Sequence, residues 1–386
     1  MADIASLGFG RDIFQPEHDA FRESVRRFLQ REVVPNVRQW EAEGFFPPEL
    51  FRKAGAAGLL CSAMPTEYGG GGGDVLHHLV LQEEHAFVPE ANLLEGGLLT
   101  DIAAFTIADF GTDEQKRTWL PLFATGECIS EIAMSEPAAG SDFSAIRCQA
   151  RRDGDDWVIS GQKSWITNGP ILTMALVIAN TQSDSGKPTK STFIVPMGLP
   201  GISRKPTELI ARTCGGVGEI FFDDVRVPGS HLLGGETGNG MRAGLGLMRI
   251  GRIAMAARSI AASEVARDLT VEYTKDRQAF GKRIFDFQNT QFKLASAATE
   301  IAAGRAFVDS GMRQLVEGCL TAEHAAMVRL FCTEVEGRVM DECLQLHGGM
   351  GCSNEAIISK LYTLARMRRI YGGTNEIMRL IIGGAL

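Results

Sequence analysis

The stretch Arg369-Ile-Tyr-Gly-Gly-Thr-Asn-Glu-Ile-Met378 places two consecutive glycines directly before a run that favours a helix. Glycine adopts backbone conformations and close approaches that other residues resist, so Gly372 and Gly373 predict a tight loop. Thr374 is a favoured N-cap residue, which predicts a helix beginning at Asn375. Such a loop and helix start present backbone N–H groups to an electron-rich ligand.

The sequence before this stretch predicts a bundle of long helices. Apolar residues recur at helical spacing with few breakers, and helices of this length suit an antiparallel four-helix bundle. The predicted helices run from Met241 to Thr274, Phe287 to Glu317, Thr321 to Leu346 and Glu355 to Arg368.

The middle of the chain changes to the alternating pattern that is typical of strands. A hairpin is predicted from Arg147 to Ser160, with its turn at Asp153-Gly154-Asp155. Short antiparallel strands of this kind indicate a small barrel or sandwich. Further strands are predicted at Met174 to Asn180, Ser191 to Pro196 and Glu219 to Val225, with polar turn residues at 183–190.

The first part of the chain is predicted to be helical, with helices at Val75 to Phe87, Ile102 to Phe110 and Asp113 to Phe123. Thr112 is a suitable N-cap for the last of them. The predicted fold class is therefore α+β and multi-domain. We expect an N-terminal all-α domain over residues 1–125, a β domain over 126–235 and a C-terminal helical bundle over 236–386.

Composition excludes several classes of function. The net charge of -8 argues against non-specific binding to nucleic acid or to an anionic membrane. The eight cysteines form no Cys-x-x-Cys pair, so neither a metal site nor a disulfide framework is predicted. The N-terminus lacks the pattern of a signal peptide, and no apolar run approaches the ~20 residues of a membrane span. We expect a cytoplasmic protein.

Two stretches in the middle of the chain suit the approach of a flat ring. One reads Ile132-Ala-Met-Ser-Glu-Pro-Ala-Ala-Gly-Ser-Asp142, and the other reads Gly161-Gln-Lys-Ser-Trp-Ile-Thr-Asn-Gly169. Small residues allow close approach, and an indole excludes water from a ring edge. Taken singly, the first is also compatible with an ordinary turn and the second with a tryptophan in the core.

Together with Asp276-Arg-Gln-Ala-Phe-Gly281 and Gln345-Leu-His-Gly-Gly-Met-Gly351, these stretches resemble the acyl-CoA dehydrogenase family over essentially the whole chain. The resemblance implies a helical, β, helical three-domain fold with bound FAD. It implies desaturation of an acyl-CoA or acyl-carrier thioester by proton abstraction and hydride transfer to flavin N5. It also implies a homodimer or homotetramer and an electron acceptor such as an electron-transfer flavoprotein.

The resemblance assigns cofactor and substrate contacts by position. Trp165 covers a flavin edge, and the Thr167 hydroxyl donates to flavin N5. Arg277, Gln288 and Gln345 match positions that complete the site of a neighbouring subunit. The implied cofactor contacts are Ile132, Met134, Ser135, Ser141, Trp165, Ile166, Thr167, Arg277, Phe280, Phe287, Gln288, Gln345, Gly348, Gly349, Thr374 and Glu376. The implied substrate contacts are Ser141, Arg249, Arg252 and Gly373.

The catalytic base of the family is missing from both of its usual places. Gly372 stands where the family has Tyr-Glu-Gly-Thr, and Gly251 stands where other members carry a Glu before an Arg. Arg252 and Tyr371 remain beside them as supporting residues. The backbone N–H of residue 372, which polarises the substrate carbonyl in the family, survives a change to glycine.

The candidate for a relocated base is Asp101, because the family's corresponding helix start lines the acyl pocket and one cyclohexenecarboxyl-CoA type places its base there. Glu95 is the weaker second candidate. The structural alternative for Asp101 is a helix N-cap, for which Asp is favoured.

Four functions stay open at this point. The first is a dehydrogenase that uses Asp101, with a cyclic or unsaturated acyl group as a candidate substrate. The second is a base-less FAD-binding subunit of a heteromeric dehydrogenase. The third is a flavin monooxygenase or oxidase on the same scaffold, and the fourth is a purely structural binding protein.

Overall fold

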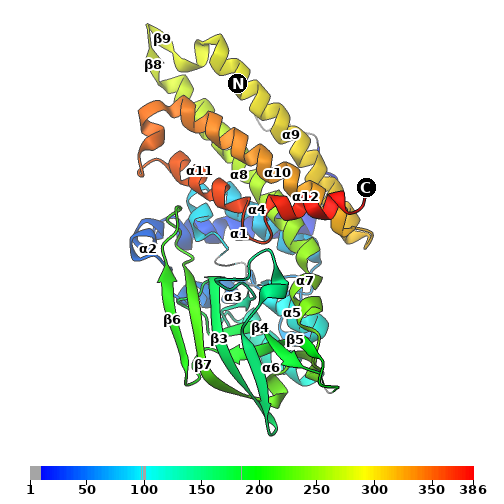
Figure 1. The fold of residues 1–386 in the computed structure, drawn as a ribbon. Coiled ribbons are helices and arrows are strands. Elements are labelled where there is room, and N and C mark those ends of the chain that lie inside the picture. The colour runs from blue at the N-terminus through cyan, green and yellow to red at the C-terminus, as the bar shows by residue number, and fades with distance from the viewer. Residues whose placement is uncertain (1–9, 97, 99–100, 184) are drawn as a thin grey trace. The chain divides into compact units, whose positions relative to one another are not determined.

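The computed structural model describes residues 10–386 except positions 97, 99, 100 and 184 (Figure 1). Position 184, inside a predicted turn, therefore lies outside the described residues. The chain forms two compact units. Unit 1 comprises Met1–Pro35, Val75–Leu93 and Arg249–Leu386, and unit 2 comprises Asn36–Asp74 and Leu94–Met248. The order of helical, sheet and helical segments confirms the predicted α+β class, whereas the three predicted domain boundaries stay predictions.

Unit 1 is helical, and its long helices α8, α9 and α10 lie side by side (Figure 1). Their apolar residues form one core together with residues of α4 and α11. Its helices are α1 (Pro16–Phe28), α4 (Val75–Phe87), α8 (Met248–Asp276), α9 (Gln288–Val316), α10 (Ala322–His347), α11 (Ile357–Arg368) and α12 (Asn375–Gly383), and its hairpin is β8 (Gln278–Ala279) with β9 (Lys282–Arg283). A π-helical turn, η2 (Leu29–Val33), follows α1.

Two glycines of α9 allow it to pack closely on α8. A Cβ at Gly304 would lie 2.4 Å from Cδ1 of Ile260, and a Cβ at Gly311 would lie 2.7 Å from Cδ1 of Ile253. The two glycines are seven residues apart on α9, and the two isoleucines are seven apart on α8. Seven residues are close to two helical turns, so both contacts lie along the same line between the two helices.

Unit 1 also buries two carboxylates of α4, Glu83 and Glu84, which are both 0% exposed. Four arginines neutralise them. Arg11, Arg22 and Arg305 form ion pairs with Glu83, and Arg22 and Arg26 form ion pairs with Glu84. These pairs, which we call the Glu83 network, join α1, α4 and α9.

Unit 2 is built on a seven-stranded sheet with the strand order β1-β4-β2-β3-β7-β6, and β5 pairs with β4. The predicted hairpin is confirmed as β2 and β3, which pair antiparallel. The strands are β1 (Ser130–Ala133), β2 (Gln149–Asp153), β3 (Asp156–Thr167), β4 (Met174–Gln182), β5 (Pro188–Pro196), β6 (Ile202–Thr207) and β7 (Val217–Pro228). The helices of unit 2 are α2 (Val37–Glu43), α3 (Glu49–Ala56), α5 (Asp101–Phe110), α6 (Asp113–Ala124) and α7 (Gly240–Gly246).

The sheet departs from the prediction in two places. Strand β1, which was not predicted, pairs with β4 in parallel, so the sheet is not purely antiparallel. Strand β6 was also missed, because it is polar and contains Pro206. Proline is tolerated there since β6 lies at the end of the strand order.

The helix predicted from Met241 to Thr274 is wrong in its first turns. It is two helices, α7 and α8, separated at Leu247. Gly244 and Gly246 lower the helix propensity just before this break. Gly244 also faces β4, because a Cβ there would lie 2.6 Å from Cδ1 of Ile178.

In the described part of the chain, no helix is both long enough and apolar enough to cross a bilayer.

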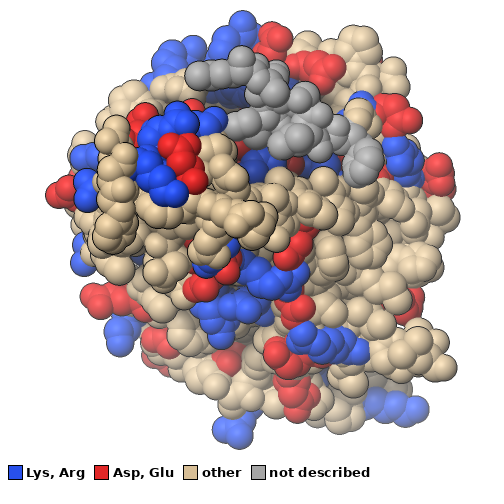
Figure 2. All heavy atoms as spheres, turned by 90° about the horizontal axis from the view of Figure 1, so that it is seen from above, with Lys and Arg blue, Asp and Glu red and all other residues tan. Residues whose placement is uncertain are grey.

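On the face shown in Figure 2, basic and acidic side chains are interspersed.

Candidate functional site

The two predicted flavin stretches lie next to each other in unit 2. The backbone N–H of Ser164 donates to the carbonyl oxygen of Ser135 at 2.9 Å. Lys163 reinforces this contact, because its Nζ donates to the carbonyl oxygen of Met134 at 3.1 Å and to Glu136 Oε1 at 2.7 Å. Sequence stretches about thirty residues apart therefore form one surface.

The ion pair between Lys163 and Glu136 was missed by the sequence analysis. Both residues are buried, and Glu136 also accepts hydrogen bonds from the backbone N–H groups of Arg147 and Cys148. The available signal was a charged residue in the interior of each stretch, among small and apolar residues. The pair therefore links the two predicted flavin stretches to each other.

Trp165, predicted to cover a flavin edge, is exposed and has an uncommon backbone conformation. Its indole is 61% exposed, although large aromatic side chains are normally buried. Its φ of +61° is uncommon for a bulky residue, so the surrounding strand imposes the conformation. The neighbouring Ile166 is buried, and Thr167 is half-buried.

The remaining predicted contacts of unit 2 lie in β1 or follow it in the chain. Ile132 in β1 is half-buried, Met134 is buried and Ser135 is half-buried. Ser141 is exposed.

The segment that carries the candidate bases approaches Thr167. Gly96 has a φ of +76°, and a Cβ at this position would lie 3.1 Å from Cγ2 of Thr167. The adjacent Glu95 is 8% exposed. The structure thus brings the start of the segment 95–101 against the residue expected to contact flavin N5.

Asp101 is the first residue of α5 and is 2% exposed. Its Oδ1 accepts a hydrogen bond from the backbone N–H of Cys61 at 3.3 Å. Cys61 has a φ of +51°, so the acceptor on Asp101 helps to hold an uncommon backbone conformation. Burial, together with the nearby charge of Asp101, raises the pKa of the Cys61 thiol well above its ordinary value.

In unit 1 the predicted loop is confirmed. Gly372 and Gly373 have φ values of +65° and +92°, and Thr374 caps α12 by accepting the N–H of Ile377. Gly372 is exposed, and no described residue accepts its backbone N–H. That N–H is therefore available to a ligand.

Arg329 of α10 holds this loop from behind. Its Nη1 donates to the carbonyl oxygen of Gly372 and its Nη2 to that of Tyr371, both at 2.5 Å. Arg329 is 0% exposed, and no carboxylate among the described residues forms an ion pair with it. Burial lowers the pKa of Arg329 to about 10, so the guanidinium stays charged at neutral pH. No motif in the sequence predicts this role for Arg329.

The predicted supporting arginines lie on the first turns of α8. Arg249 donates to the carbonyl oxygen of Leu320 at 2.9 Å, and Arg252 donates to that of Ala322 at 3.2 Å. Arg252 is 9% exposed, its Nε has no hydrogen-bond partner, and burial lowers its pKa. Gly251 is half-buried within the same helix.

The residues predicted to reach a second subunit form an exposed group. Phe280, at the tip of the β8–β9 hairpin, is 96% exposed and makes an edge contact with Phe287. Lys282 Nζ lies 4.0 Å from the centre of the Phe287 ring. Arg277 and Gln288 are exposed at the two ends of this hairpin segment.

The turn after α10 lies against the end of α8. The rings of Tyr273 and His347 stack with their centres 4.3 Å apart, and the Tyr273 hydroxyl donates to the His347 carbonyl oxygen. The structure thus brings Gln345, Gly348 and Gly349, which are all exposed, near the base of the hairpin.

Glu376 lies in the first turn of α12 and is exposed. Backbone hydrogen bonding, followed by a hydrogen bond with the Thr374 side chain, lowers its pKa. This geometry is that of a helix-capping carboxylate.

The predicted cofactor contacts of unit 2 and those of the unit 1 hairpin have side chains that fit parts of a flavin dinucleotide. In unit 2, an exposed indole, the Thr167 hydroxyl and a surface of small residues suit the flat ring. In unit 1, an exposed guanidinium at Arg277 suits a pyrophosphate, and the Phe280 and Phe287 rings suit an adenine.

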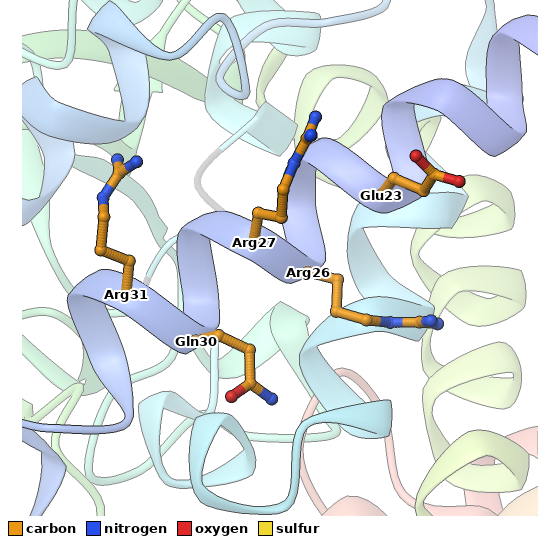
Figure 3. A pocket seen from close by; sticks show the side chains of 5 residues that line it. All are labelled: Glu23, Arg26, Arg27, Gln30 and Arg31. Atoms are coloured by element: carbon orange, nitrogen blue, oxygen red, sulfur yellow. The ribbon is translucent and has the colours of Figure 1, made fainter.

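A surface depression of about 630 Å³ lies elsewhere in unit 1 (Figure 3). It is lined by one helical segment that spans α1 and η2. None of its lining residues is a predicted site residue, so we assign no substrate to it. The lining residues are Glu23, Arg26, Arg27, Gln30 and Arg31.

Comparison with known proteins identifies the family. Residues 15–127, 131–225 and 238–386 match the N-terminal, middle and C-terminal domains of acyl-CoA dehydrogenase, respectively. The mitochondrial long-chain specific acyl-CoA dehydrogenase of Sus scrofa is 39% identical over 384 residues, which cover 98% of this chain and 88% of that protein.

Solved structures show the same fold. An acyl-CoA dehydrogenase from Geobacillus kaustophilus has a TM-score of 0.92 and 36% identity, covering 97% of this chain and 99% of that one. A glutaryl-CoA dehydrogenase from Mycobacterium smegmatis, in complex with FADH2, has a TM-score of 0.88 and 27% identity, covering 96% and 95%. The chain therefore belongs to the acyl-CoA dehydrogenase family and is a flavoenzyme of the oxidoreductase class.

Proposed function

We propose that this protein binds FAD and desaturates an acyl-CoA thioester, with Asp101 as the base that removes a proton from the acyl group. The observation that carries the proposal is the approach of Gly96 to Thr167, because it places the residue after Glu95, and five before Asp101 in the chain, against the predicted flavin contact. The Mycobacterium smegmatis relative supports the cofactor, since its structure contains FADH2. FAD supplies the hydride acceptor.

The residues of the chain divide the remaining work. Trp165 excludes water from the ring, and the Thr167 hydroxyl donates a hydrogen bond to its N5 atom. Ile132, Met134, Ser135 and Ile166 bound the ring on the sheet side. The N–H of Gly372 donates to the thioester carbonyl oxygen, which makes the adjacent proton more acidic.

Asp101 accepts that proton, and Glu95 is the second candidate. The burial of Asp101 does not conflict with this role, because catalytic contacts often form only when substrate binds. Arg249, Arg252, Gly373 and Ser141 are proposed to contact the substrate. A cyclic or unsaturated acyl group is the proposed substrate class, since its acidic proton need not lie where the usual base acts.

We also propose a homodimer or homotetramer. Arg277, Phe280 and Gln345 are exposed, and an exposed phenylalanine at a hairpin tip is unfavourable unless a partner or cofactor covers it. The proposed electron acceptor is an electron-transfer flavoprotein, and the thioester is carried by CoA or by an acyl-carrier protein.

The test is anaerobic mixing of the FAD-loaded protein with a panel of linear, cyclic and unsaturated acyl-CoAs, followed by flavin absorbance. We expect at least one acyl-CoA to bleach the flavin without an added partner. A parallel oxygen-uptake assay distinguishes an oxidase or monooxygenase, which would consume oxygen rapidly. Absence of bleaching with every acyl-CoA would contradict the proposal.

A base-less subunit is the second candidate, and one observation favours it: both usual seats of the base, at 251 and 372, are glycine. This candidate predicts that the Gly372→Glu variant gains ordinary desaturase activity that the parent lacks. It also predicts that activity of the parent appears only on co-expression with a homologous partner. Bleaching by the parent alone would eliminate it.

A further inference from the structure

Arg329 binds the carbonyl oxygens of two successive peptide groups in the 371–373 loop. The N–H of each group points in the opposite direction, away from Arg329. The carbonyl oxygen of Tyr371 belongs to the same peptide group as the N–H of Gly372. The carbonyl oxygen of Gly372 belongs to the same group as the N–H of Gly373. Arg329 therefore contacts the acceptor end of each group through the hydrogen bonds of 2.5 Å described above.

We propose that Arg329 is a positioning residue for the thioester, which fixes the 371–373 loop and strengthens the N–H of Gly372 as a donor to the substrate carbonyl oxygen. The inference rests on the proposed function, because it requires that an acyl-CoA binds against this N–H.

The physical basis is polarisation along a chain of hydrogen bonds. A cation on the carbonyl oxygen of a peptide group draws electron density from its nitrogen, so the N–H becomes a better donor. A better donor withdraws more charge from the thioester carbonyl, which lowers the pKa of the adjacent C–H. The effect reaches the substrate although Arg329 never touches it.

The surroundings preserve the charge of Arg329. No described carboxylate pairs with it, in contrast to the buried Arg368, which pairs with Glu336. A Cβ at Gly372 would lie 4.0 Å from Nη2 of Arg329. A carboxylate side chain starting there would compete for the guanidinium, so glycine at 372 leaves the cation directed at the two carbonyl oxygens.

The experiment measures the acidity of a bound probe rather than turnover. Acetoacetyl-CoA is suitable, because its C2 proton lies between two carbonyls and its enolate absorbs in the ultraviolet. The FAD-loaded protein is titrated with pH at saturating probe, and the apparent pKa of the bound probe is compared among parent, Arg329→Lys and Arg329→Gln.

We expect the apparent pKa to rise in the order parent, Arg329→Lys, Arg329→Gln. Lysine keeps the charge but has no planar fork to hold both carbonyl oxygens, so its value is intermediate. The full shift is about one unit, or tenfold, which is below the ~10²–10³-fold effect of removing an oxyanion donor itself.

Thr333→Val is the matched control. Thr333 lies one turn after Arg329 on α10, is 0% exposed and donates to Asn375 Oδ1 at 3.2 Å, but it contacts no carbonyl of the loop. It should lower stability without moving the pKa of the probe. A shift equal to that of Arg329→Gln would overturn the inference.

Equal apparent pKa values in parent and Arg329→Lys would also overturn it, and this arm remains decisive if Arg329→Gln does not fold. A parent protein that binds FAD but does not perturb acetoacetyl-CoA or any other acyl-CoA would instead contradict the proposed function. The two failures are therefore distinguishable.

Discussion

Two groups of arginines in unit 1 differ in the partners that surround their charge. In the Glu83 network each guanidinium meets a buried carboxylate. At the 371–373 loop, Arg329 is 0% exposed and donates to backbone carbonyl oxygens and to the Met378 sulfur, with no carboxylate partner among the described residues. Since an unneutralised buried charge is costly, its retention at one loop indicates a role other than holding helices together.

The largest effect on stability is expected in the Glu83 network. Glu83→Gln removes the carboxylate that Arg11, Arg22 and Arg305 share. Their other partners are Asp309, Glu84 and Glu264, but loss of a fully buried anion among three cations should still cost about 3–5 kcal/mol. The measurement is the urea midpoint of the helical signal, because a chain of two units need not unfold in one step. Glu300→Gln is the control, since its pair with Arg338 is largely exposed and should contribute about 0–1 kcal/mol. Equal midpoints in the two variants would contradict the account.

Acid should weaken the same network. Burial alone would raise the pKa of Glu83, but Arg305, Arg11 and Arg22 lower it from 4.5 to about 2. Because the pKa of Glu83 is lower in the folded state than in the unfolded state, its ionised form stabilises the folded state at pH values above about 4.5. That contribution of about 3 kcal/mol is lost as pH falls from about 4.5 towards 2. We expect the thermal midpoint of the parent to fall more steeply in this window than that of Glu83→Gln. Parallel curves would show that Glu83 does not titrate as described.

Removal of an arginine separates the two kinds of environment, because Arg368 is paired with a carboxylate and, among the described residues, Arg329 is not. Arg368→Met leaves the buried Glu336 without its cation and should cost about 3 kcal/mol or more. Arg329→Met leaves no carboxylate behind and loses hydrogen bonds to uncharged acceptors, so about 1–3 kcal/mol is expected. Both are read from urea midpoints. A larger loss for Arg329→Met would show that its charge is neutralised after all.

The smallest effect is expected from the loop backbone itself. Gly372→Ala has room for its methyl group, which would lie 3.5 Å from Cε of Met255, so only the positive φ is unfavourable. The expected loss is about 1–2 kcal/mol. Gly318→Ala is the matched control, because Gly318 has a φ of +70° and open space around it. A much larger loss at 372 would mean that packing, rather than backbone conformation, requires glycine there.

Much of the fold followed from local patterns. Helix α4 begins and ends at the predicted residues, and Thr112 and Thr374 cap α6 and α12 as expected. Periodicity and capping depend on neighbouring residues, so the sequence contains them. The four-residue strand β1 was missed because its pairing with β4 is made more than forty residues away.

The site was less predictable, because its contacts join residues that are far apart in the sequence. The role of Arg329 depends on carbonyl oxygens that any residue carries, 42 and 43 positions along the chain, so no side-chain pattern signals it. Lys163 and Glu136 were likewise visible only as charges in apolar stretches. Asp101 is the first residue of α5, whereas an N-cap precedes the first helical residue, and residues 99 and 100 lie outside the described part of the chain.

The central claim, that the base has moved to Asp101, is tested most directly by the rate of anaerobic flavin reduction in Asp101→Asn, with Glu95→Gln measured beside it. Asparagine keeps the oxygen that accepts the Cys61 N–H but cannot take a proton, so fold, FAD content and acyl-CoA affinity should be retained. We predict that flavin reduction falls by ~10²–10⁴-fold, as for loss of a general base, and that Glu95→Gln changes it far less. A rate in Asp101→Asn within about threefold of the parent, far short of that loss, would contradict the claim and remove Asp101 from the mechanism.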